Sequence, residues 1–128
     1  MSAAAPDSTD IVERALLGSL MLVGAVALPK VTKLLKPVAF VREKHRVIYE
    51  AILEVAKETD PDLVLVIADL DSSNQLGRAG GAAYVSGLLD DLPCVDNVVF
   101  YARHVQERAV LRKAAASSTT RDWRTRER

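Results

Sequence analysis

Apolar residues in the middle of this chain recur with the spacing of an α-helix. Between His45 and Thr59 the aliphatic residues stand at positions i, i+3, i+4, i+7 and i+8: Ile48, Ala51, Ile52, Val55 and Ala56. Because an α-helix turns once in 3.6 residues, this spacing gathers the aliphatic side chains on one face and leaves charged residues on the other. The segment predicts an amphipathic helix that ends before Pro61, with Ile48, Ile52 and Val55 in the core.

Two helices are predicted before this segment. Asp10 and Glu13 offer an N-terminal cap for a helix that is apolar over most of its circumference up to Val23. A shorter helix follows Gly24, and Pro37 closes it. A helix with so wide an apolar face is typical of the centre of a core or of a surface shared with a partner.

The run from Leu63 to Ile67 is ambiguous, because its β-branched residues suit a strand whereas the spacing of Val66, Ile67 and Leu70 suits a helix. No second convincing strand exists to pair with it, so we predict a helix.

Two more helices are predicted after the glycines of segment 77–81, which mark a turn. One ends at Pro93, and a last long helix begins near Asp96 and ends at the hydroxyl residues 117–120, which compete with helical hydrogen bonds. The fold class is therefore all-α, a compact orthogonal bundle of about six helices. We expect a flexible N-terminus at residues 1–9, the helical domain at 10–116 and a basic, disordered tail at 117–128.

Composition excludes several classes of protein. A chain of 128 residues fits one domain, and 49% hydrophobic with 27% charged residues is typical of a soluble protein. The most apolar stretch, 16–28, is shorter than the roughly 20 residues that cross a bilayer, and it lacks the basic leader of a secretory signal. The single cysteine, Cys94, suits a reducing compartment. We expect a cytoplasmic protein without a membrane span.

No catalytic, cofactor-binding or metal-binding residue is predicted, so we expect no enzymatic activity from the chain on its own. A phosphate-binding loop needs a lysine and a hydroxyl residue after its glycines, but Ala82 and Ala83 follow the glycine cluster. His45 and His104 lie in different predicted helices without a second metal ligand at helical spacing. We expect His45 to pack or hydrogen-bond near a helix start and His104 to lie on the surface.

Two features leave nucleic-acid binding open, although the net charge of zero removes the overall positive field of a nucleic-acid-binding protein. Residues 77–80 match the GXXG loop of some RNA-binding domains, but that fold needs a β-sheet beside the loop, and a turn between helices explains the glycines. The basic tail is either a solubilising terminus or an arm for phosphates, with a tryptophan able to stack on a base. Its candidate contacts are Arg121, Trp123, Arg124, Arg126 and Arg128.

Several short segments, taken in chain order, form a pattern that none of them carries alone. They are Glu13–Leu20, Phe40, His45–Ile52, Gly80–Tyr84, Asn97, Tyr101-Ala102 and Glu107–Arg112. From about Asp10 to Arg112 the chain resembles, in order and spacing, the N-terminal domain of the DnaB-type bacterial replicative DNA helicases.

The resemblance implies a protein-interaction and oligomerisation module of DNA replication. In that family the domain forms a dimerising collar on a hexameric ring and helps to position primase. We therefore expect self-association, as a homodimer or higher oligomer, and binding to a replicative helicase, a primase or a helicase loader. Because the last helix carries much of the family's assembly surface, the candidate partner-binding residues are Tyr101, Val105, Arg108 and Leu111. The family's ATP hydrolysis belongs to a RecA-like domain that this sequence lacks.

The sequence departs from the family pattern at a few places. Val38-Ala39 replace the usual acidic residues, Val41 replaces an aromatic residue, and 63–66 is unusually apolar. After about Ala116 the expected helical hairpin gives way to Ser, Thr and Arg. Each local change exposes or buries extra aliphatic surface, which indicates either drift or a changed partner surface. A small nucleic-acid-binding protein that uses the basic tail remains the alternative.

Overall fold

The structure is a computed structural model that describes residues 8–90 and 95–127, with side chains described up to Ala116. These residues form α1 (Ser8–Leu34), η2 (Pro37–Ala39), α2 (Glu43–Ala56), α3 (Leu63–Ser72), α4 (Ala82–Gly87), η3 (Val95–Asn97) and α5 (Val98–Glu127). The described part of the chain contains no strand, so the predicted all-α class is confirmed. Its α-helices number five, or six if the two halves of α1 are counted separately.

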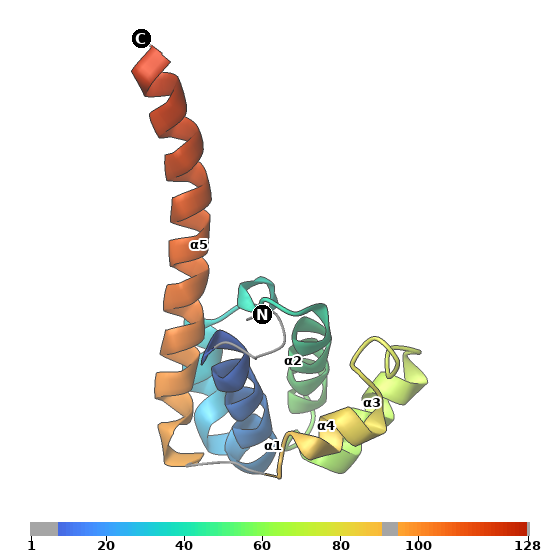
Figure 1. The fold of residues 1–128 in the computed structure, drawn as a ribbon. Helices are drawn as coiled ribbons and strands as arrows, with labels where there is room; N and C mark the ends of the chain where they lie inside the picture. The colour runs from blue at the N-terminus through green and yellow to red at the C-terminus, as the bar shows by residue number, and fades with distance from the viewer. Residues whose placement is uncertain (1–7, 91–94, 128) are drawn as a thin grey trace.

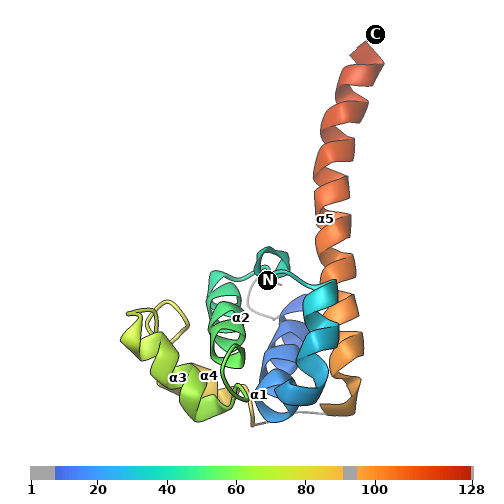
Figure 2. The ribbon, with the colours of Figure 1, turned by 180° about the vertical axis from the view of Figure 1, so that it is seen from behind.

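The helices form a bundle from which α5 projects. The first half of α5 lies along α1, and α2 packs against α1 on the side away from α5 (Figure 1). The helix α3 lies beyond α2, at the end of the molecule opposite α5, and α4 runs below α2 between α1 and α3 (Figures 1 and 2). Between these layers, Ile48 and Ile52 are fully buried as predicted, whereas Val55 is only partly buried.

The helix α1 is the centre of the core. It is long and apolar enough to cross a membrane by length and composition, but most of its most apolar stretch is buried inside the protein. Its backbone leaves helical geometry at Val23, next to the predicted boundary at Gly24. A Cβ on Gly24 would lie 2.8 Å from Cγ of Pro61, so the absent side chain lets the break in α1 approach the loop after α2.

The ambiguous run is helical, as predicted, and forms α3. The Asp62 carboxylate accepts a hydrogen bond from the Leu65 backbone N–H at 2.9 Å, which caps the helix start. Of the ten residues of α3, only Val66 and Leu70 are buried. The side chains of Val64 and Leu65 remain 72% and 39% exposed, so α3 presents an aliphatic face to solvent.

The helix α5 is longer than the sequence analysis predicted. Its backbone continues as a helix through the hydroxyl residues 117–120 to Glu127, so the predicted helix end near Ala116 is wrong, whereas the disorder expected of the tail stays a prediction. Hydroxyl residues lower helix propensity by only a few tenths of a kcal/mol each, and extending a helix costs far less than starting one. At the N-terminal end of the chain, α1 begins at Ser8, and residues 1–7 lie outside the described part.

Candidate protein-interaction site

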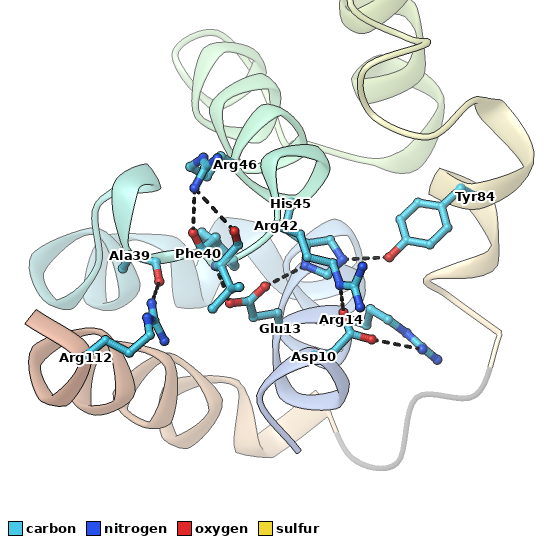
Figure 3. A network of polar contacts seen from close by, with 11 residues as sticks. Asp10, Glu13, Arg14, Ala39, Phe40, Arg42, His45, Arg46, Tyr84 and Arg112 are labelled. Carbon is cyan, nitrogen blue, oxygen red and sulfur yellow. Dashed lines mark hydrogen bonds and ion pairs between the residues drawn. The ribbon is translucent and has the colours of Figure 1, made fainter. Parts of the chain in front are cut away.

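A buried network of polar side chains joins the helices α1, α2 and α4 (Figure 3). Nδ1 of His45 in α2 lies 2.6 Å from Oε1 of Glu13 in α1, and the Val41 backbone N–H donates to Oε2 of Glu13 at 2.7 Å. Nε2 of His45 lies 2.6 Å from the hydroxyl of Tyr84 in α4. Glu13 and His45 are fully buried, where a carboxylate is tolerated only with such partners. The network therefore fixes α1, α2 and α4 together.

The edge of this network is ionic. Nε of Arg42 donates to the Asp10 carboxylate, and Nη1 of Arg14 lies 3.6 Å from the other carboxylate oxygen (Figure 3). Burial raises the pKa of Tyr84, and the negative charge of Asp10 raises it further. The helix α1 begins at Ser8, so Asp10 and Glu13 lie inside it and not at its predicted start; the Asp10 carboxylate binds Arg42, and the Glu13 carboxylate binds Val41 and His45.

The glycine cluster forms the turn between α3 and α4. Gly80 and Gly81 have φ values of 99° and 90°, which side-chain-bearing residues rarely adopt, and a Cβ on Gly80 would lie 2.9 Å from Cδ2 of Tyr84. Nη2 of Arg78 donates to Oε2 of Glu43 at 2.6 Å, and this guanidinium holds the pKa of the Glu43 carboxyl below its usual value. The glycine cluster is therefore an inter-helix turn, and it places Tyr84 against the buried histidine.

The sequence analysis predicted the surroundings of only one residue of the network, His45. His45 was expected to pack or hydrogen-bond near a helix start, and it does. Its partners Glu13 and Tyr84 were missed, although a glutamate in a helix apolar almost all round is itself a signal of a buried partner. His104, expected on the surface, is partly exposed, and its Nε2 is buried. In the described residues, no group of three or more His, Cys, Asp or Glu side chains could hold a metal ion.

The predicted partner-binding residues of α5 do not share one environment. Arg108 is exposed, Leu111 is 59% exposed and Tyr101 is partly buried. Val105 is fully buried in the core, so its assignment to a partner surface is wrong: it lies on the face of α5 that packs inside the bundle. Val110 is 52% exposed beside Leu111, and the sequence analysis did not single it out.

A groove of about 690 Å³ runs between the end of α1, η2 and α5. Val38, 77% exposed, and Val110 line it together with the more deeply set Leu35. Nη2 of Arg112 donates to the Ala39 carbonyl at 2.9 Å and so ties α5 to η2 (Figure 3). The charged residues that line this groove are all basic: Lys33, Lys36, Arg112 and Lys113.

The departures from the family pattern lie largely on the surface. Val38 and Val64 are more than 70% exposed, and Val41 and Leu65 are 49% and 39% exposed. The candidate nucleic-acid contacts Arg121, Trp123, Arg124 and Arg126 lie along the helical backbone of α5, but their side chains lie outside the described part of the chain, as does Arg128.

Comparison with known proteins identifies the family. A family model described as the DnaB-like helicase N-terminal domain matches residues 5–107. The chain belongs to this family. The replicative DNA helicase DnaB of Geobacillus stearothermophilus is 42% identical over 118 residues, which are 90% of this chain and 26% of that protein. DnaB of Mycobacterium leprae is 36% identical over 108 residues, 84% of this chain and 18% of that protein. This DnaB-like domain thus spans about a quarter or less of these relatives.

A solved structure supports the same assignment. The crystal structure of the N-terminal domain of DnaB helicase from Mycobacterium tuberculosis matches with a TM-score of 0.78 and 34% identity, over 85% of this chain and 78% of that one. The resemblance found in the sequence and the fold that it implied are confirmed. The family match ends at residue 107, so part of the groove on α5 of this DnaB-like domain lies beyond it.

Proposed function

We propose that this DnaB-like domain is a protein-interaction and oligomerisation module of DNA replication, which contacts primase and organises a helicase ring in the cytoplasm. The observation that carries the proposal is α5, which leaves the bundle and stands clear of the other helices (Figure 1). Val110 and Leu111 stay exposed on α5 at the level of η2, next to Arg112. Neighbouring exposed aliphatic residues on a projecting helix are typical of a partner surface, and the family indicates which partners to test.

Capture experiments test this proposal. The immobilised chain should retain the primase or the replicative helicase of its own organism, and the double variant Arg108→Glu/Leu111→Asp should lose at least tenfold in affinity because it puts acids into an apolar contact. Ile11→Asp, at a 52% exposed position on α1, is the matched control and should bind normally. A chain that binds neither protein and stays monomeric would contradict the proposal.

The absence of a phosphate-binding loop from the sequence leads us to propose further that these 128 residues do not hydrolyse ATP. An ATPase assay on the pure chain, with and without single-stranded DNA, should stay at background. Turnover that rises with the concentration of the pure chain would overturn this part of the proposal.

Nucleic-acid binding through the basic tail is the second candidate. The observation that favours it is the helical backbone of α5, which carries the arginines of 117–127 away from the bundle (Figure 1). Labelled single-stranded DNA should then bind at low salt and dissociate steeply as salt rises, because phosphate contacts release counterions. A chain truncated after Ala116 is the control and should not bind. DNA binding that this truncation leaves unchanged would exclude the tail.

A further inference from the structure

We infer that the groove between the end of α1, η2 and α5, here called the α1–α5 groove, binds an acidic amphipathic helical segment of another protein. The inference deepens the proposed function and rests on it, since it names the chemistry of a partner of this interaction module. The groove has a volume of about 690 Å³, which is typical of pockets that enclose a ligand.

The α5 wall of the groove is one face of a helix. Gln106, Ala109, Val110 and Lys113 line the groove at positions i, i+3, i+4 and i+7. Because a helix rises 1.5 Å per residue, this wall is about 10 Å long and matches roughly two turns of a second helix laid beside it. Helices bind in such grooves through aliphatic side chains on one of their faces.

The α1–α5 groove is apolar where it is deep and basic where it is exposed. Leu35 and Ala39 are buried, whereas Lys33, Lys36 and Lys113 are exposed. Among the side chains that the structure describes, no carboxylate forms an ion pair with any of these three lysines. Their ammonium groups therefore remain available for the carboxylates of a partner.

The walls of the groove are held together before a partner binds. Nη2 of Arg112 donates to the Ala39 carbonyl at 2.9 Å and so joins α5 to η2 across the groove (Figure 3). A preformed groove lowers the entropic cost of binding.

The lining residues favour a peptide over a nucleic acid as the occupant. The groove is lined by aliphatic and basic residues, and none of its lining residues is aromatic. Proteins that bind single strands stack the bases on aromatic side chains, and the groove has none to offer. Aliphatic side chains flanked by Asp or Glu match both properties of the groove, its apolar depth and its basic edges.

The α1–α5 groove is separate from the surface tested under the proposed function. Arg108 and Leu111 do not line it and fall on another side of α5. The double variant Arg108→Glu/Leu111→Asp should therefore leave binding to the groove unchanged.

A labelled synthetic peptide tests the inference. The probe has about 12 residues, roughly three turns of helix, with leucines at i, i+3, i+4 and i+7 and glutamates beside them. Fluorescence anisotropy should show binding to the wild type and at least tenfold weaker binding to Lys36→Glu/Lys113→Glu. Val38→Ser, which removes an apolar contact, should also weaken binding. Lys57→Glu/Arg103→Glu makes the same change of charge at exposed positions outside the groove and is the matched control.

A reversed probe and a scrambled probe complete the test. The variant Lys36→Glu/Lys113→Glu should bind a probe whose glutamates are replaced by lysines, because the charges are again opposite. A probe of the same composition without the helical spacing should bind at least tenfold more weakly to the wild type. Circular dichroism melts establish that each variant is folded.

Several results would overturn the inference: a wild type that does not bind the acidic probe, equal losses in the groove variant and in its control, or equal binding of the scrambled probe. Single-stranded DNA that binds the wild type more tightly than the probe does, and is lost in the groove variant, would place a nucleic acid there instead. A lower sedimentation mass of the groove variant without any probe would place a second copy there.

Primase and helicase capture separates this inference from the proposed function. Retained capture by a wild type that does not bind the probe removes the groove assignment and leaves the proposed function standing. Probe binding by a wild type that captures neither protein removes the proposed partners and leaves the groove assignment.

Discussion

At the scale of single residues, the Glu13–His45–Tyr84 network is the feature on which stability most depends. Replacing His45 by alanine leaves the buried Glu13 carboxylate without its ring partner. Breaking a buried pair in this way costs about 3 kcal/mol or more of unfolding free energy. Urea unfolding followed by circular dichroism measures the loss. Lys57→Ala, which removes an exposed pair with Glu54, is the control and should change nothing measurable. Equal stabilities of the two variants would show that the network is dispensable.

Tyr49 makes the unfolding free energy of the protein fall at alkaline pH. Its hydroxyl donates to the Leu35 carbonyl at 2.9 Å, and burial raises its pKa to about 12. Since the folded state holds this proton more tightly than the unfolded state, the stabilisation is complete below pH 10 and is lost as pH rises from 10 to about 12. Unfolding free energies at pH 8 and 11 measure it. Tyr49→Phe should lose the hydrogen bond at both pH values but show a smaller decrease between them; a parallel decrease would contradict the assignment.

At the scale of elements, the turn between α3 and α4 depends more on Gly80 than on Gly77. Gly80→Ala combines a positive φ with a contact against Tyr84, and we expect it to destabilise the fold by about 1–3 kcal/mol. Gly77→Ala is the matched control, because a Cβ there meets nothing within 4 Å. Thermal melts should show a lower Tm for the first variant only. Similar melts for both would mean that the turn does not position Tyr84.

At the scale of the whole molecule, α5 has one half inside the bundle and one half outside it. Among the side chains of α5 that the structure describes, up to Ala116, the buried ones are Val98, Ala102 and Val105, all in the first half. Truncation after Ala116 should therefore leave the melting temperature within a few degrees of that of the full chain, whereas truncation after Arg103 removes Val105 from the core and should unfold the domain. Differential scanning calorimetry compares the three chains. A large loss of stability on removing only 117–128 would show that the projecting half also holds the fold together.

Much of this fold could be predicted from the sequence, because the relevant signals are local. The aliphatic spacing of α2, the turn at 77–81 and the helix start near Asp96 depend on residues a few positions apart. The family could also be predicted, since its segments keep their order along the chain. The burial of Val105 on α5 could not be predicted. The sequence of a helix shows where an aliphatic residue lies on it, but not whether the core or a partner covers that residue.

The sequence by itself determined the helical class, the family and the lack of a phosphate-binding loop, because propensity, periodicity and motifs are properties of neighbouring residues. Only the tertiary structure decided which polar groups are paired and which aliphatic residues stay exposed. Glu13 and His45 are 32 positions apart, and Arg112 reaches Ala39 across 73 positions. Such pairings follow from how the helices pack, and the same packing buries Val105 while it leaves Val38 and Val64 in contact with water.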